Sequence, residues 1–100
     1  MDREQVIKIA SSYAEVVRSI INPSDIILFG SYINGNTDSN SDIDIAVVFD
    51  IFTGDYWQTI QKLHELTMSV DTRIEPVLLD VNNDPSGFVK AVRREGLKVS

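Results

Sequence analysis

Two short motifs contain the residue types in this chain that are best suited to chemistry. Phe29-Gly30-Ser31 leads from an apolar residue into glycine and serine, and Asp42-Ile43-Asp44-Ile45 follows after ten intervening residues. Where a strand ends and backbone N–H groups point outward, phosphate oxygens are well held, and glycine lets the ligand approach closely. Alone, a Gly-Ser pair is a weak signal and indicates an ordinary strand-to-helix turn with a serine cap. Its meaning depends on the second motif.

The second motif predicts a pair of carboxylates on one face of a strand. Side chains two residues apart in a strand point the same way, so Asp42 and Asp44 share a face and the isoleucines take the other. Adjacent carboxylates repel each other unless a cation lies between them, and Mg²⁺ is suited to carboxylates combined with substrate phosphates. The alternative is a solvated polar strand face. Together with Gly30-Ser31, the pair favours metal-dependent transfer of a nucleotidyl group.

A two-metal arrangement calls for a third carboxylate on a neighbouring strand. Glu75 is the preferred candidate, because it lies where a third strand is expected to begin. Asp71, just before that strand, and Asp80, just after it, are the alternatives. Arg73 would share the face of Glu75, and we expect it to form a salt bridge rather than contact phosphate.

Hydrophobic periodicity predicts the elements that must position these residues. The expected helices are 4–21, 55–69 and 85–95, and the expected strands are 26–29, 42–49, 73–79 and 97–99. A helical turn at 31–34 and a loop at 35–41 would join the two motifs. Pro76 implies an edge strand or a bulge. The order of elements predicts an α/β (α+β) fold, a mixed β-sheet flanked by helices, with antiparallel pairing near residues 27 and 45.

Two details of the helices bear on packing. Spacing places Tyr56 on the buried stripe of the 55–69 helix, and Trp57 beside it is expected to pack in the core or an interface rather than stack on a base. Asp84 is expected to cap the last helix, with Pro85 in its first turn. His64 has no second histidine or cysteine near it to form a zinc site and is expected to have a surface or packing role.

Bulk composition limits the function classes. The 100 residues, 43% hydrophobic and 24% charged, suit one globular domain spanning 1–100. A net charge of −6 argues against direct nucleic-acid binding, and the absence of cysteine excludes disulfides and thiolate metal sites. The lack of a long apolar stretch predicts no membrane span and a cytoplasmic location. So small a domain leaves little area to enclose an acceptor, which favours a partner or a homo-oligomer.

These motifs resemble the minimal nucleotidyltransferases (MNT) of the polymerase-β nucleotidyltransferase superfamily. The signature of that family is hydrophobic-Gly-Ser, a loop, Asp-hydrophobic-Asp-hydrophobic and a later acidic residue, which Phe29-Gly30-Ser31, Asp42–Ile45 and Glu75 match. The ending, where Glu95-Gly96 leads into an apolar tail, is also similar, so the resemblance covers nearly the whole chain. Members commonly have arginine where this chain has Asn34, and the lost charge predicts weaker triphosphate binding or turnover.

The resemblance implies a fold, a reaction and a partner. It implies a polymerase-β-like nucleotidyltransferase fold that uses ATP and two Mg²⁺ ions. Asp42 and Asp44 would bind metal and, with Gly30 and Ser31, the nucleotide, while Glu75 would hold the second ion and assist deprotonation of an acceptor hydroxyl. In the HEPN/MNT antitoxin type, the acceptor is a tyrosine of a helical HEPN toxin, which would make this chain an antitoxin and a protein adenylyltransferase.

Two other functions remain open at this stage. The chain could be a non-catalytic antitoxin that neutralises its partner by forming a complex, which the substitution at Asn34 favours. It could also modify a small molecule such as an aminoglycoside antibiotic. Such enzymes normally add a C-terminal helical domain, whereas this chain stops at Ser100.

Overall fold

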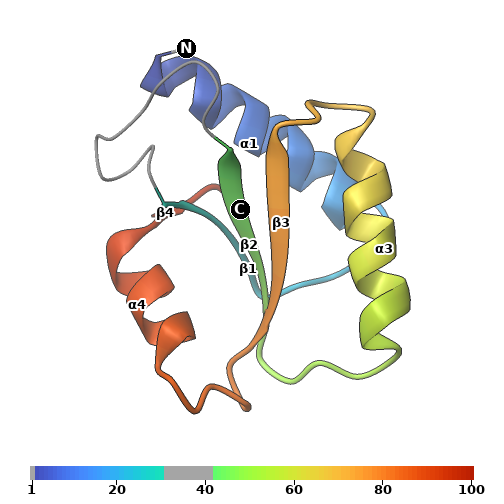
Figure 1. Ribbon diagram of the computed structural model, residues 1–100, viewed down its shortest axis with the longest axis vertical. Helices are drawn as coiled ribbons and strands as arrows, with labels where there is room; N and C mark the ends of the chain where they lie inside the picture. Colours follow the sequence, from blue (N-terminus) through green and yellow to red (C-terminus); the bar gives the residue numbers. More distant parts are fainter. Residues whose placement is uncertain (1, 31–41) are drawn as a thin grey trace.

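Three helices and four strands make up the part of the chain that the structure, a computed structural model, describes: residues 2–30 and 42–100 (Figure 1). In chain order they are α1 (Arg3–Arg18), β1 (Asp25–Phe29), β2 (Ile43–Phe49), α3 (Tyr56–Thr67), β3 (Ile74–Asp80), α4 (Phe88–Glu95) and β4 (Leu97–Lys98). The predicted turn at 31–34 and loop at 35–41 lie outside the described residues. No helix in the described ranges is long and apolar enough to cross a membrane.

The strands form one mixed sheet in the order β3-β2-β1-β4. β1 and β2 are antiparallel, with Ile27 opposite Ala46, which confirms the pairing predicted near residues 27 and 45. β2 and β3 are parallel, with Ala46 opposite Val77. β3 is therefore an edge strand, and this is where a strand can accommodate Pro76 without losing an internal ladder bond. The predicted fold class is confirmed.

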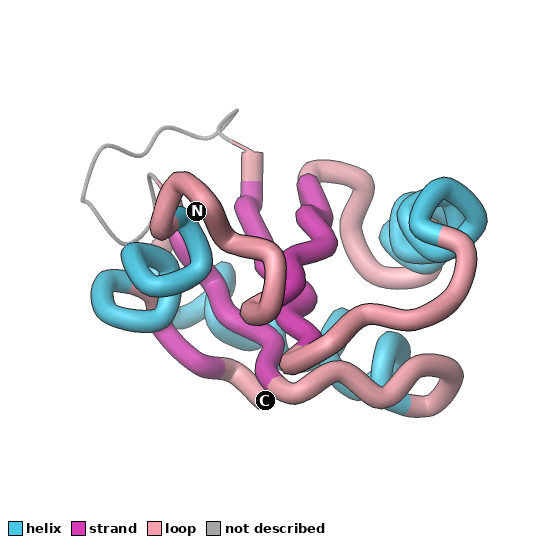
Figure 2. Tube along the Cα trace, turned by 90° about the horizontal axis from the view of Figure 1, so that it is seen from below, coloured by secondary structure: helices cyan, strands magenta, loops and turns pink. Residues whose placement is uncertain are grey.

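The sheet separates two apolar clusters, because alternate side chains of β2 point to opposite faces. Figures 1 and 2 place α3 and α4 on opposite sides of the strands. The larger cluster joins the sheet to α1 and α3, and the Tyr13 hydroxyl there donates a hydrogen bond of 2.7 Å to the carbonyl of Leu63. The smaller cluster lies under α4 and contains Ile27, Ala46, Val48, Val89 and Val92. The face under α4 is thus the more thinly covered of the two.

Two helix ends differ from prediction. α1 begins with a capping box between Asp2 and Gln5 and ends at Arg18, not at residue 21. α4 begins at Phe88 and not at Pro85, because residues 84–87 form a turn that ends at Gly87, with a φ of +75°. Asp84 caps the helix as predicted, but across that turn, since its carboxylate accepts a 3.1 Å hydrogen bond from the N–H of Val89.

The first turn of α3 also departs from prediction. Tyr56 is not on a buried stripe: it is 42% exposed, and Trp57 is 77% exposed. The Tyr56 ring packs edge-on against Phe52, at 6.3 Å between centroids, rather than on the sheet. Leu63 and Thr67, which helical spacing also places on that stripe, are buried, and His64 is exposed, which agrees with a surface role. Only the second half of α3 is therefore anchored in the core.

Candidate active site

β2 presents Asp44 on the face of the sheet that α4 covers only in part. Ile43 and Ile45 are fully buried on the opposite face, so the strand alternates as the motif predicts. Asp42 lies just before the first residue of β2 and is exposed, whereas Asp44 is half-buried. Burial of these apolar side chains fixes which face of the sheet each residue of β2 occupies. The carboxylate of Asp44 therefore points to the opposite face.

Glu75 lies directly opposite Asp44 on the neighbouring strand. The parallel register of β2 and β3 pairs these two residues, and adjacent strands lie roughly 4.8 Å apart. Partial burial raises the pKa of Asp44 above its ordinary value, and the negative charges of Asp42 and Glu75 raise it further. The carboxylates of Asp42 and Glu75 therefore both act electrostatically on Asp44.

The other two candidates for the third carboxylate are held elsewhere. Asp80 is five residues farther along β3, roughly 16 Å from Glu75, and its carboxylate accepts hydrogen bonds from the N–H groups of Phe52 and Asn82. Asp71 forms the salt bridge predicted for Arg73, at 2.7 Å, and the hydrogen bonds from Arg73 lower the pKa of Asp71. Of the three, only Glu75 faces Asp44.

Gly30 brings the end of β1 against the carboxylate of Asp44. Its φ is +82°, a left-handed conformation that side chains other than glycine rarely adopt. A Cβ atom at this position would overlap Oδ2 of Asp44. The glycine thus allows a close contact with a carboxylate of the same chain, whereas the predicted close approach of a phosphate stays a prediction. Ser31 and Asn34 lie outside the described residues.

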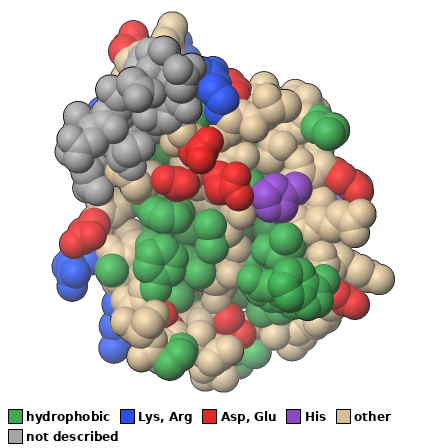
Figure 3. Space-filling view, in the orientation of Figure 1, with side chains coloured by type: hydrophobic (Ala, Val, Ile, Leu, Met, Phe, Trp, Pro, Cys, Tyr) green, Lys and Arg blue, Asp and Glu red, His purple; other side chains and the backbone are tan. Residues whose placement is uncertain are grey.

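The chemistry of these side chains fits a divalent cation bound jointly with a nucleotide. No group of three His, Cys, Asp or Glu side chains within residues 2–30 and 42–100 is gathered closely enough to hold a metal ion by itself. Mg²⁺ usually takes one or two carboxylates and completes its shell with substrate phosphates and water. The repulsion that Asp42 and Glu75 exert on Asp44 is what such a cation would relieve. In Figure 3, acidic side chains gather in one group on this face.

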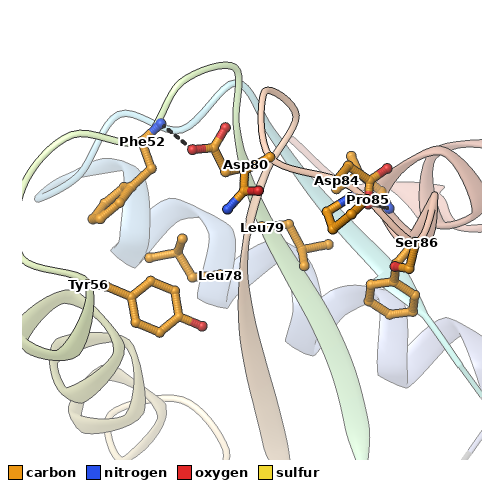
Figure 4. A pocket seen from close by; sticks show the side chains of 11 residues that line it. Phe52, Tyr56, Leu78, Leu79, Asp80, Asp84, Pro85 and Ser86 are labelled. Atoms are coloured by element: carbon orange, nitrogen blue, oxygen red, sulfur yellow. Dashed lines mark hydrogen bonds between the residues drawn. The ribbon is translucent and has the colours of Figure 1, made fainter.

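A second feature is a pocket at the far end of β3, lined by both apolar and polar side chains (Figure 4). Its volume is about 480 Å³, and its walls come from the segment before α3, the end of β3 and the start of α4. Sequence reasoning missed this pocket because its residues are far apart in the chain. The one signal of it in the sequence was the aromatic pair at the start of α3.

Comparison with known proteins connects this geometry to a family. The family model described as "Polymerase beta, Nucleotidyltransferase" matches residues 4–99. Among solved structures, a Sulfolobus solfataricus protein described as a candidate nucleotidyltransferase has a TM-score of 0.69 at 22% identity, covering 96% of this chain and 80% of its own. A chain of a toxin-antitoxin structure with AMP-PNP has a TM-score of 0.62 at 29% identity, covering 90% of this chain and 72% of its own. No curated protein matches.

Proposed function

Because this chain belongs to the polymerase beta nucleotidyltransferase family, we propose that it moves AMP from ATP to an acceptor hydroxyl in a Mg²⁺-dependent reaction. The observation that carries the proposal is the register of β2 and β3, which sets Glu75 opposite Asp44, with Asp42 just before β2 and near enough for its charge to act on Asp44. The contact between Gly30 and Asp44 adds the end of β1 to this group. Three strands thereby contribute to one site.

Each residue has a distinct role in the proposed reaction. Asp42 and Asp44 hold Mg²⁺ together with the triphosphate, and the ion neutralises phosphate charge when bound. Glu75 accepts the proton of the acceptor hydroxyl. The hydroxyl oxygen forms a bond to the α-phosphorus, the bond from that phosphorus to the bridging oxygen breaks, and pyrophosphate leaves. Positioning and charge neutralisation account for most of the catalysis in such reactions.

The proposed acceptor is a tyrosine of a helical HEPN-domain toxin, which makes this chain an antitoxin and a protein adenylyltransferase. Two findings support a protein partner. One of the similar structures is a toxin-antitoxin assembly that contains AMP-PNP, an ATP analogue. Asp42 and Glu75 are also exposed and Asp44 is half-buried on a sheet face that α4 covers only in part, so an acceptor bound there would supply part of its own enclosure.

A second candidate function is neutralisation of the partner by binding alone. It is favoured by the finding that the described carboxylates do not by themselves form a metal site, and by Asn34 in place of the arginine common in minimal nucleotidyltransferases. In this case, the partner would be silenced without any transfer of AMP.

The test combines the purified protein, Mg²⁺, ATP labelled at the α-phosphate and the protein encoded by the neighbouring reading frame. The label is followed by denaturing gel and mass spectrometry. We expect labelled partner with the wild type, none with Asp42→Asn/Asp44→Asn, and a strong loss with Glu75→Gln. Asp71→Asn is the matched control, because it removes a nearby carboxylate held by Arg73 and should keep turnover.

The same experiment separates the two candidates. A double variant that no longer labels the partner and no longer silences it supports transfer as the function. If the double variant still silences the partner in a stable complex, binding alone is the function and the proposed reaction is wrong. If Asp71→Asn abolishes transfer while Glu75→Gln does not, the assignment of the third carboxylate is wrong.

A further inference from the structure

The outer edge of β3 offers free backbone groups over only part of its length. The N–H of Ile43 donates to the carbonyl of Arg73, and the N–H of Val81 donates to the carbonyl of Phe49, so odd-numbered residues of this segment point toward β2. The even-numbered residues therefore point outward. Among these, Pro76 has no N–H and the N–H of Ile74 donates to Asp71. Both backbone groups of Leu78 and the N–H of Asp80 remain, because the carbonyl of Asp80 accepts a hydrogen bond from the N–H of Asn83; they lie at the pocket end of the strand.

Aromatic side chains form walls on both sides of this stretch. Phe52 and Tyr56 stand on the α3 side, beside Leu78 and Leu79 (Figure 4). Phe88, the first residue of α4, lines the other side. Tyr56 and Phe88 are each 42% exposed. In the space-filling view, green apolar areas lie on either side of a tan strip, below the acidic group (Figure 3). The result is a groove along the strand edge, about 480 Å³ in volume, which we call the β3 groove.

The walls are braced by edge-to-face aromatic contacts. Phe49 and Phe52 have ring centroids 5.1 Å apart, and Phe52 in turn contacts Tyr56. On the other wall, Phe88 packs edge-on against Phe29 at 5.8 Å. Each exposed ring is thus fixed by a ring behind it, which lowers the entropy lost when a ligand binds. Rigid, partly exposed aromatic side chains are typical of protein-binding sites.

The charge of the groove is negative. Its charged lining residues are Asp80 and Asp84, and neither forms a salt bridge with a described residue. Backbone groups fix both carboxylates: the N–H of Phe52 donates to Asp80, and the N–H of Val89 donates to Asp84. Two oriented aspartates beside apolar walls favour an apolar side chain flanked by a cation.

We propose that the β3 groove binds an extended segment of the acceptor protein, in which an apolar residue is followed or preceded by lysine or arginine. The segment pairs with the outward backbone groups of Leu78 and Asp80, as in strand addition to a sheet edge. Its apolar side chain lies between Tyr56 and Phe88, and its cation lies at Asp80 and Asp84. A segment of glycine or small polar residues would leave the aromatic walls of the groove uncovered and would give Asp80 and Asp84 no cationic partner.

The position of the groove relates it to the carboxylates. Leu79 and Glu75 are four residues apart on β3 and share a face, so the groove begins roughly 13 Å from Glu75. A segment docked there would hold its protein beside the carboxylates. In naming the occupant as the acceptor protein, this inference rests on the proposed function. The binding of a segment of this chemistry does not depend on it.

The test uses a phage-displayed library of random 12-residue peptides, selected on the wild type without nucleotide. We expect enrichment of sequences with an aromatic or branched apolar residue next to lysine or arginine. For a synthetic peptide of the enriched sequence, Tyr56→Ala and Phe88→Ala should each weaken binding at least tenfold. Met68→Ala is the control, because Met68 lies at the other end of α3 and is 80% exposed. Replacing the basic residue of the peptide by glutamate should also weaken binding at least tenfold.

Amide hydrogen exchange tests the backbone pairing directly. At saturating peptide, the N–H groups of Leu78 and Asp80 should exchange at least tenfold more slowly, which docking through side chains alone would not cause. Peptide binding should be unchanged in Asp42→Asn/Asp44→Asn, so failure of catalysis and failure of docking are distinguishable. Selection of acidic or featureless peptides, or protection elsewhere, would overturn the proposal. So would a stable dimer in sedimentation that buries Tyr56 and Phe88.

Discussion

Replacement of Gly30 by alanine separates two reasons for glycine at the end of β1. At a φ of +82°, alanine costs about 1–2 kcal/mol of stability, because its Cβ crowds the backbone in a left-handed conformation. The second reason is contact. The added Cβ would overlap Oδ2 of Asp44 and lie 3.1 Å from Cγ and 3.3 Å from Cβ of the same residue. The side chain of Asp44 therefore has to move.

The two effects have separate readouts. We expect urea unfolding to show the loss of about 1–2 kcal/mol from the backbone conformation. Titration calorimetry with Mg²⁺ and a non-hydrolysable ATP analogue should show affinity reduced about tenfold or more, equivalent to about 1.4 kcal/mol, because Asp44 no longer faces Glu75. Displacing a carboxylate that orients a metal typically has an effect of this size.

Gly87→Ala is the matched control. Gly87 has a φ of +75°, but a Cβ there would meet nothing within 4 Å. It should lose similar stability and keep wild-type affinity for the nucleotide. The reasoning is refuted if Gly30→Ala binds the analogue as tightly as the wild type, since the contact with Asp44 would then not shape the site. Equal loss of affinity in Gly87→Ala would instead indicate a general effect of destabilisation.

Three further predictions concern stability. The pKa of Asp44 is raised in the folded protein, so its ionised form disfavours folding above that pKa. Asp44→Asn should therefore raise Tm at pH 7 in metal-free buffer. The gain in Tm should vanish as the pH falls to the ordinary aspartate pKa. No gain at pH 7 would contradict the burial of Asp44. Tyr13→Phe should cost about 1 kcal/mol in urea unfolding, because the hydroxyl hydrogen bond to Leu63 is lost, and a neutral result would show that this bond contributes nothing. Gly96→Ala should cost about 1–3 kcal/mol, because its Cβ would meet Ile27 at 2.5 Å and two carbonyl oxygens within 2.9 Å; Ser19→Ala, at an exposed site, provides a comparison.

The parts of the site that sequence could predict are those set by local geometry. The alternation of Asp42-Ile43-Asp44-Ile45 determines which side chains share a face, whatever the strand pairs with. Likewise, the apolar residues of β1 and β2 on either side of a turn-rich segment predicted an antiparallel pair, and the pairing of Ile27 with Ala46 agrees. These features depend on neighbours a few residues apart.

The parts that sequence could not predict depend on register between distant segments. Asp71, Glu75 and Asp80 all offer a carboxylate near the expected third strand, and although Glu75 is the candidate that the sequence favours, it is the register of β3 on β2 that places Glu75 at Asp44. The helix α3 and its loops lie between those strands, so no local pattern contains that register. Helical spacing predicts Tyr56 on a buried stripe, yet its ring is 42% exposed and packs against Phe52, a contact with the preceding loop that the spacing does not contain.

The edge position of β3 links the site to the groove proposed for docking. Glu75, near the start of the strand, lies opposite Asp44 of β2. Near the end of the strand, backbone groups of Leu78 and Asp80 point outward. Pro76 lies between these two stretches and removes an outward N–H, so strand addition is directed to the far end and away from the carboxylates. A protein bound at that end would leave the carboxylates open to nucleotide. One strand can therefore give a domain of 100 residues both a reaction site and a means of positioning its acceptor.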